Sequence, residues 1–266
     1  MRNPARSLHR RGVARQQQSG GGDQCLIFGI HAVGAVLGNP RRSIRKLYLT
    51  DNAERRLQAA LAGRQIARER VLPRDLERRL GADAVHQGAL IEAEPLPEPS
   101  LGEMAAGAGD RPLLVLDQVT DPHNVGAVLR SAAVFGAGGL VMTRRHSPPL
   151  DGALAKSASG ALEHVPVALV QNLARAIADL KALGVAVIGL DASAAESLEE
   201  GDWPEAAALV LGAEGKGLRQ LTRESCDRLA RITADGRFAS LNVSNAAAIA
   251  LHWAAAHRLG LLGAGR

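Results

Sequence analysis

The sequence contains few cysteines, few aromatic residues and no long apolar run. Its 266 residues include two cysteines, Cys25 and Cys226, which stand far apart and form no Cys-x-x-Cys or His/Cys pattern. This usage argues against a disulfide framework and a structural zinc site, and it predicts a reducing cytoplasm. No apolar stretch approaches the roughly 20 residues that a membrane helix needs. Aromatic residues make up 2% of the chain, so any nucleic acid would be held mainly by charge.

Positive charge is unevenly distributed along the chain. Residues 25–92 carry twelve Lys and Arg against seven acids, whereas residues 93–110 carry four acids and no base, and residues 111–266 carry fifteen of each sign. The basic surplus therefore lies before residue 93. This asymmetry favours a front part that meets a polyanion and a rear part with another task, although a solvated Arg-rich helix face would also explain the central segment.

The first 22 residues have no acid, contain five arginines and end in Ser19-Gly20-Gly21-Gly22. Two interpretations stay open for this stretch. It is compatible with an organelle transit peptide, but the simpler interpretation, which we adopt, is a disordered basic tail that adds weak affinity for RNA.

The chain divides by composition into a tail at 1–24, a small α/β domain at 25–94, a Pro/Gly-rich acidic linker at 95–110 and a larger domain at 111–266. In the small domain the apolar pattern predicts strands near 27, 45–50 and 89–93 and helices up to 37, at 53–62 and at 73–80. In the larger domain, short continuous apolar strands alternate with helices. That alternation predicts a parallel sheet covered on both faces.

Ligands of such sheets bind outside the carboxyl ends of the strands, so the turns after the strands are the places to search. Three of these turns carry unusual residues. Residues 121–130 (DPHNVGAVLR) cap a helix with Asn124 and place Arg130 in an otherwise apolar helix. Residues 211–218 (LGAEGKGL) form a glycine-rich turn around Glu214. Residues 240–247 (SLNVSNAA) open an Ala-rich helix with Ser240 and Asn242.

Neither common nucleotide-binding fingerprint fits these turns. Val210 stands where a Walker A loop has its first glycine, and Gly217 stands where Ser or Thr should follow Lys216. The glycines at 136–139 precede a strand instead of following one, so they do not form a dinucleotide fingerprint.

Taken in order, the three segments resemble the three motifs of the SpoU/TrmH-type (SPOUT class) RNA 2'-O-ribose methyltransferases. Residues 156–167 (KSASGALEHVPV) are similar to a further segment of that family. Residues 28–33 (FGIHAV) and 86–88 (HQG) look like the substrate-binding domain of the branch that methylates the ribose of a guanosine in large-subunit (23S) ribosomal RNA.

The resemblance implies a Rossmann-like parallel sheet with a deep trefoil knot, preceded by a small α/β RNA-binding domain. It implies S-adenosyl-L-methionine as cofactor, no metal, ribosomal RNA as partner and a homodimer formed through the C-terminal domain. Carried over by position, the cofactor contacts are Gly212, Glu214, Ile232, Leu241 and Asn242.

The same resemblance places Arg130 at the ribose and implies catalytic roles for Asn124, Glu214, Ser240 and Asn242. Because a guanidinium hardly loses its proton in proteins, we expect Arg130 to hold phosphate and stabilise the nascent alkoxide instead of acting as the base. The other four side chains would orient the hydroxyl or an intervening water. Two alternatives stay open at this point: methylation of a different ribose, in transfer RNA or at another nucleotide of ribosomal RNA, and a catalytically silent RNA-binding assembly protein.

Overall fold

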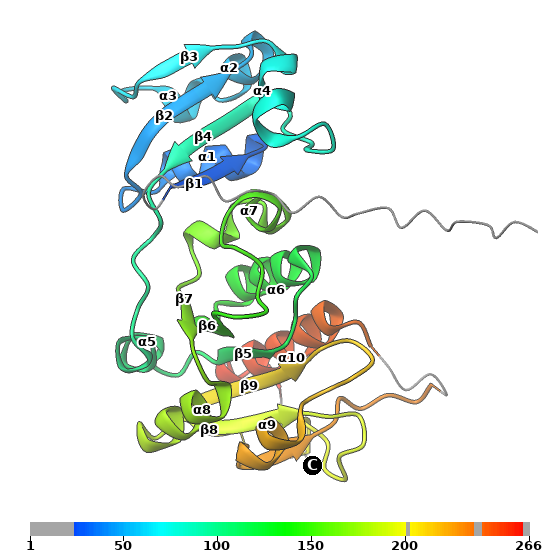
Figure 1. Ribbon diagram of the computed structural model, residues 1–266. Coiled ribbons are helices and arrows are strands. Elements are labelled where there is room, and N and C mark those ends of the chain that lie inside the picture. The colour runs from blue at the N-terminus through cyan, green and yellow to red at the C-terminus, as the bar shows by residue number, and fades with distance from the viewer. Residues whose placement is uncertain (1–23, 201–202, 237–240, 263–266) are drawn as a thin grey trace, which may run out of the picture.

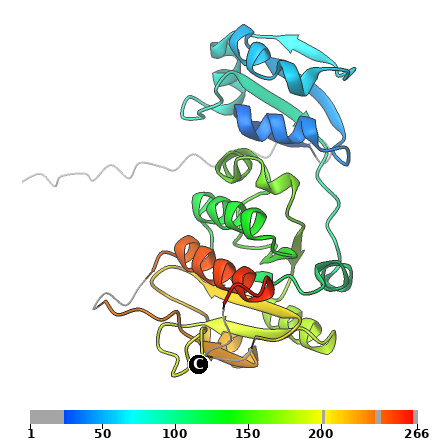
Figure 2. The same cartoon turned by 180° about the vertical axis from the view of Figure 1, so that it is seen from behind.

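The protein consists of two sheets, each with its own helices, stacked along one long axis (Figures 1 and 2). The computed structural model describes residues 24–200, 203–236 and 241–262. We call residues 25–93, which hold the first sheet, the N-terminal module. Residues 101–258, which hold the second sheet, are the C-terminal module.

The N-terminal module has a four-stranded sheet in the order β1-β4-β2-β3. Strand β4 pairs antiparallel with both β1 and β2, while β3 adds to β2 in parallel. The strands are β1 (Cys25–Phe28), β2 (Ile44–Leu49), β3 (Arg68–Arg70) and β4 (Ala89–Ala93). The helices are α1 (Ile30–Gly38), α2 (Asp51–Arg56), α3 (Gln58–Leu61) and α4 (Pro73–Leu80).

Two features of this module differ from the sequence pattern. The helix expected over 53–62 is broken at Leu57, whose backbone (φ −98°, ψ 4°) leaves the helical region and separates α2 from α3. Strand β3 was not predicted. Its three residues, Arg68, Glu69 and Arg70, are all exposed, so no alternation of apolar and polar side chains marks them as a strand.

The C-terminal module has a six-stranded sheet in the order β10-β8-β9-β5-β6-β7. Within the described residues all of its strand pairings are parallel, which confirms the predicted parallel sheet. The strands are β5 (Leu113–Asp117), β6 (Gly139–Thr143), β7 (Val167–Val170), β8 (Ala186–Leu190), β9 (Ala207–Gly212) and β10 (Arg228–Ala230).

Helices cover both faces of this sheet, because alternate side chains of a strand point to opposite faces. Leu114 and Leu116 of β5 belong to one apolar cluster, whereas Leu113 and Val115 belong to another. The first cluster includes residues of α6 (Pro122–Phe135), α7 (Gly152–Ala158) and α10 (Val243–Arg258). The second includes residues of α5 (Leu101–Ala108) and α8 (Leu173–Ala182). The remaining helices are α9 (Gln220–Ser225) and the short 3₁₀ helix η1 (Ala161–Glu163).

The segment predicted as a linker contains a helix. Helix α5 begins at a capping box, in which the Ser100 hydroxyl accepts a hydrogen bond from the Glu103 amide (3.2 Å) and the Glu103 carboxylate accepts one from the Ser100 amide (2.8 Å). Its Met104 is 3% exposed within the second apolar cluster. The Pro and Gly content of the region hid this signal, and the extended connection is limited to residues 94–100.

The burial of Met104 gives a stability prediction. Met104→Ala should lower the free energy of unfolding by about 2–5 kcal/mol, because it leaves a cavity between α5 and the sheet. Gly102→Ala, on the exposed side of the same helix with open space around it, should change stability by less than about 1 kcal/mol. Urea denaturation of both variants measures the difference. Equal effects would show that α5 is not packed on the sheet.

Candidate functional site

A cleft of about 580 Å³ opens at the carboxyl edge of the C-terminal sheet. Its walls come from the turns after β8, β9 and β10 and from the start of α10, which is where an open α/β sheet places its ligands. The lining includes Leu190 to Ser193, Leu211 to Leu218, Arg223, Arg231, Ile232, Ala234, Gly236, Leu241, Val243 and Ala246.

The turn after β9 is closed on itself by the backbone. The Gly217 amide donates a hydrogen bond to the Ala213 carbonyl (2.8 Å), which makes the turn a tight loop with Glu214 at its tip. A Cβ atom at Gly212 would lie 2.0 Å from the carbonyl carbon of Gly217. Because this neighbour is backbone, only glycine allows the two ends of the loop to meet.

An ion pair between a buried carboxylate and a half-exposed arginine holds the far end of the same loop. Asp117, at the end of β5, is fully buried and accepts hydrogen bonds from the Arg219 amide (3.0 Å) and from its Nε (2.7 Å). Arg219 is the N-cap of α9. The pair therefore ties the residue that follows the glycine turn to the neighbouring strand, and this fixes the turn over the sheet edge.

Asn242 connects all three of the segments that the sequence singles out. Its Nδ2 donates hydrogen bonds to Asn124 Oδ1 (3.0 Å) and to Glu214 Oε2 (3.1 Å). Its Oδ1 accepts from the amide of Ser244 (2.9 Å) and caps α10. One side chain thus joins the start of α6, the glycine turn and the start of α10.

Asn124 is held in place by the way α6 begins. The N-cap is Asp121, which accepts a hydrogen bond from the His123 amide (2.9 Å), so the prediction that Asn124 caps this helix was wrong and Asn124 lies in its first turn. Pro122 occupies the first helical position, where its missing N–H costs nothing. One turn further on, Gly126 packs against Ser157 and Ala158 of α7, close enough that a Cβ atom would collide with them. Helix α6 is therefore fixed on both sides of Asn124.

The opposite wall of the cleft contains charged residues that the sequence analysis missed. Asp191 follows β8 and pairs with Arg223 (Nη1 to Oδ2, 2.5 Å). Burial alone would raise the pKa of Asp191, but hydrogen bonds from Ser193 and the charge of Arg223 outweigh it, so the net pKa is lowered. The cleft therefore presents a carboxylate at neutral pH. The rule that ligands meet strand ends could have found Asp191, since it directly follows an apolar strand.

The structure brings together most of the predicted site residues. Gly212, Glu214, Ile232 and Leu241 line the cleft. Asn124 and Asn242 are joined to Glu214 by the hydrogen bonds given above.

Two predicted residues stand apart from this group. Arg130 is exposed on α6 and is not among the residues that line the cleft, and no hydrogen bond or ion pair joins it to another residue in the described ranges. Ser240 lies outside the described residues.

Both cysteines are free thiols, and burial raises the pKa of Cys226 to about 11, which leaves it a poor nucleophile at neutral pH. Within residues 24–200, 203–236 and 241–262, no group of three His, Cys, Asp or Glu side chains is placed to hold a metal. No helix in those ranges is long and apolar enough to cross a membrane.

Two family descriptions match the chain. Residues 111–252 match the SpoU rRNA Methylase family, and residues 26–99 match the family "RNA 2'-O ribose methyltransferase substrate binding". The second match spans the N-terminal module, and the first spans the strands, turns and helix start that build the cleft.

Relatives of known name cover most of the chain. It is 43% identical to the 23S rRNA (guanosine-2'-O-)-methyltransferase RlmB of Ralstonia nicotianae, over 88% of this chain and 96% of that protein. It is 38% identical to the RlmB of Vibrio cholerae, over 88% and 97%.

Solved structures share the fold. The SpoU methyltransferase AviRb from Streptomyces viridochromogenes, in complex with AdoMet, superposes with a TM-score of 0.77 at 23% identity, over 91% of this chain and 92% of that one. A putative RNA methyltransferase of the TrmH family from Porphyromonas gingivalis superposes with a TM-score of 0.71 at 26% identity, over 87% and 89%.

The contact between Gly212 and Gly217 predicts a sharp effect on ligand binding. Gly212→Ala should abolish measurable binding of S-adenosylmethionine, because the new methyl group would force the loop open. Gly215→Ala is the matched control, because a Cβ atom there meets open space. Its backbone has φ +75°, so the substitution should lower the free energy of unfolding by about 1 kcal/mol through backbone strain and leave cofactor binding measurable. Calorimetry on both variants, with circular dichroism to verify folding, measures this. Equal binding by the two variants would contradict the role of the close contact.

Proposed function

The chain belongs to the SpoU rRNA methylase family, and on that premise we propose that it transfers a methyl group from S-adenosylmethionine to the 2'-hydroxyl of a guanosine ribose in 23S ribosomal RNA. The observation that carries the proposal is that Asn124 and Asn242 are hydrogen-bonded, through Asn242, to Glu214, which lines the cleft. Three segments far apart in the sequence supply these residues. Relatives named for this reaction cover nearly the whole chain.

The residues of the cleft suit this cofactor. Its volume, about 580 Å³, lies in the range of small-molecule sites, which is roughly 300–1,000 Å³. The glycine turn exposes backbone groups to a ligand, Leu211, Ile232 and Leu241 offer apolar surface, and Asp191 and Glu214 offer carboxylates for hydroxyl or amino groups. When bound there, the cofactor supplies an electrophilic methyl group on a sulfonium.

Catalysis in this site is a matter of alignment and charge. The 2'-oxygen forms a bond to the methyl carbon as the carbon–sulfur bond breaks, and the hydroxyl proton must leave at the same time. We assign the orientation of the hydroxyl, or of a water that accepts its proton, to Asn124, Glu214, Ser240 and Asn242. The hydrogen bonds of Asn242 hold the Glu214 carboxylate beside Asn124.

Arg130 has a different task in this proposal. It is exposed, and the described residues offer it no protein partner. A guanidinium keeps its proton and donates several hydrogen bonds, so it suits a phosphate and a developing alkoxide better than it suits the role of a base. We therefore assign Arg130 to the RNA side of the reaction.

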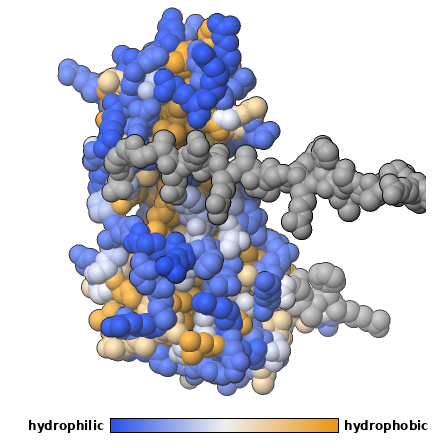
Figure 3. Space-filling view, in the orientation of Figure 1, coloured by the Kyte–Doolittle hydropathy of each residue, from blue (hydrophilic) through white to orange (hydrophobic). Residues whose placement is uncertain are grey.

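RNA binding is assigned mainly to the N-terminal module. This module holds the basic surplus of the sequence and matches a family described as substrate binding. Its visible face is mostly hydrophilic (Figure 3), which fits a contact made through charge. We divide the chain into the domains 25–94 and 111–266, with a tail at 1–24 and a connection at 95–110 that includes α5.

Further parts of the proposal concern assembly, topology and compartment. We propose a homodimer through the C-terminal module, where α6 and α10 pack together and leave Val134 and Ile249 exposed. The trefoil knot rests on family membership and stays a prediction. Cytoplasmic location is proposed because relatives of this chain are named for methylation of 23S ribosomal RNA.

The proposed reaction is tested by methyl transfer to natural RNA. Purified protein is incubated with S-adenosylmethionine carrying a tritiated methyl group and with total RNA from a strain that lacks the enzyme. We expect label in one guanosine ribose of 23S RNA, found by fragmentation and mapping. Label in transfer RNA would change the substrate, and no label in any RNA would indicate a catalytically silent RNA-binding protein.

Arg130→Ala tests whether methyl transfer can be lost while cofactor binding is kept. Methyl transfer should fall by roughly a hundredfold or more, because phosphate and alkoxide lose a charged hydrogen-bond donor. Binding of S-adenosylmethionine by calorimetry should stay within about twofold of wild type, since Arg130 does not line the cleft. Arg175→Ala, at another exposed arginine of the same module, controls for loss of charge. Equal loss of transfer and of cofactor binding would show that Arg130 has a structural role.

A further inference from the structure

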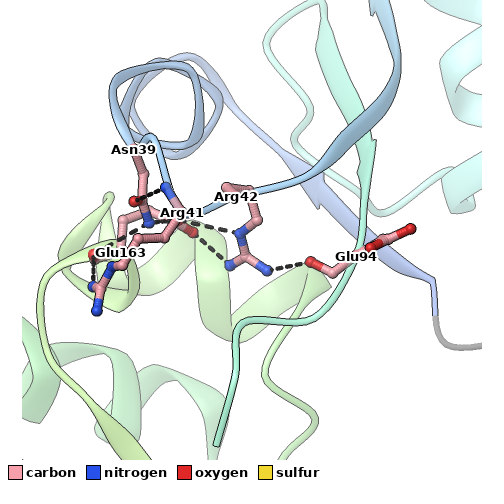
Figure 4. A network of polar contacts seen from close by, with 5 residues as sticks. All are labelled: Asn39, Arg41, Arg42, Glu94 and Glu163. Atoms are coloured by element: carbon pink, nitrogen blue, oxygen red, sulfur yellow. Dashed lines mark hydrogen bonds and ion pairs between the residues drawn. The ribbon is translucent and has the colours of Figure 1, made fainter.

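A buried ion pair joins the two modules (Figure 4). Arg42, in the loop between α1 and β2, bonds through Nη2 to Glu163 Oε1 (2.6 Å) and through Nε to Oε2 (3.1 Å). Glu163 lies in η1 of the C-terminal module, and both side chains are only 2% exposed. Because two parallel hydrogen bonds join the guanidinium to the carboxylate, the pair fixes the relative orientation of the two groups as well as their distance.

The groups around the pair complete its hydrogen bonds. Asn39, at the end of α1, donates from Nδ2 to Glu163 Oε2 (2.8 Å). The third nitrogen of the Arg42 side chain, Nη1, donates to the carbonyl of Glu94 (2.8 Å), where the chain leaves the N-terminal module. The charges of Arg42 and Glu163 and their hydrogen-bonding groups are therefore satisfied inside the interface, where both side chains are buried.

Apolar side chains and one close glycine contact surround the ion pair at the interface between the modules. One apolar cluster runs through both modules and includes Val33 and Leu37 of α1 together with Leu154 and Leu162 of the C-terminal side. Gly160, which precedes η1 with φ +97°, lies against Ala35 of α1, where a Cβ atom would come within 2.6 Å of the Ala35 Cβ. Helix α1 thus sits directly in the turn between α7 and η1.

The surface that receives the N-terminal module is connected to the reaction site. Helix α7 lies between the N-terminal sheet and α6 (Figures 1 and 2). Its Ser157 hydroxyl donates to the carbonyl of His123 (3.3 Å), the residue before Asn124. A change in the docking of the N-terminal module therefore changes the position of bound RNA relative to Asn124 and the cleft.

The energetics point to orientation as the role of the pair. Apolar contact alone can hold two surfaces together at several angles, whereas burying two charges is costly unless one geometry pairs them completely. A buried ion pair therefore gives little net affinity but penalises every other arrangement. This penalty matters in an enzyme that must bring one ribose among many to within bonding distance of a methyl group.

We propose that Glu163 is a positioning residue: through its buried pair with Arg42 it sets the angle of the N-terminal module to the cleft, and so determines which ribose of a bound RNA is methylated. The inference rests on the proposed RNA methyltransferase function. It adds to that function a means of selecting the target that uses no contact between Glu163 and RNA.

The test compares variants in the full-length chain. Arg42→Gln and Glu163→Gln each break the buried pair, and the double variant removes both charges. Arg45→Gln is the matched control, because it removes one positive charge three residues away from an exposed pair with Glu94 (3.4 Å; 47% and 49% exposed). The readouts are kcat for RNA methylation, the position of the label, RNA affinity by filter binding, cofactor affinity by calorimetry, and hydrogen exchange.

Each single variant should lower kcat on the order of 10- to 100-fold relative to Arg45→Gln and spread label to other riboses. RNA affinity should stay near that of Arg45→Gln, and cofactor affinity near wild type. Hydrogen exchange should rise in 30–42 and 152–165 but not in β5 and β9. Because both residues act through one contact, the double variant should be no worse than the singles.

A different pattern would overturn the proposal. If Arg42→Gln keeps the kcat and the target of Arg45→Gln, the pair does not position the module. If the loss of kcat comes with lost cofactor affinity or with faster exchange across β5 and β9, the pair only stabilises the fold. Should the charge variants precipitate, Arg42→Lys keeps the positive charge but loses the two-pronged contact with the Glu163 carboxylate, and an unchanged kcat and target would again contradict the proposal. Failure of wild type to label RNA would refute the proposed function instead.

Discussion

The hydrogen bonds of Asn242 are the contact on which the site depends. Its side-chain nitrogen serves Asn124 and Glu214 at once, while its oxygen caps α10 through the Ser244 amide. A helix start, a glycine turn and a second helix start, which are remote in the sequence, therefore share one set of polar contacts at the edge of a parallel sheet. Without this residue the loop tip and α6 would have no common anchor among the contacts described.

A close backbone contact and two ion pairs fix the geometry around that site. Gly212 allows the turn to close against Gly217, and the Asp117–Arg219 pair holds the end of the turn to β5. The Arg42–Glu163 pair does the same between modules, over a larger distance in the chain. Both side chains of the Arg42–Glu163 pair are buried, so this pair selects one arrangement of the modules while the apolar contacts around it give stability.

The parallel sheet was predictable because its strands are continuous apolar runs followed by turns of unusual composition. The same reasoning led to Gly212, Glu214 and Asn242, which all follow strands or cap helices. It missed β3, whose three residues carry no alternation, and α5, whose capping box lies in a Pro/Gly-rich stretch. Pairs such as Arg42 and Glu163 cannot be predicted from local patterns, since nothing near either residue indicates its partner. Arg130 stayed apart from the cleft in the described residues, so its role still rests on resemblance.

The most direct measurement is a crystal structure of the protein with S-adenosylmethionine bound. The account predicts the cofactor in the cleft between the Gly212–Gly217 turn and the lining residues Arg231, Ile232, Leu241 and Val243, with its methyl group facing Asn124 and Asn242. Density for the cofactor elsewhere on the molecule, or a methyl group turned away from these two residues, would contradict the claim that Asn242 assembles the reaction site.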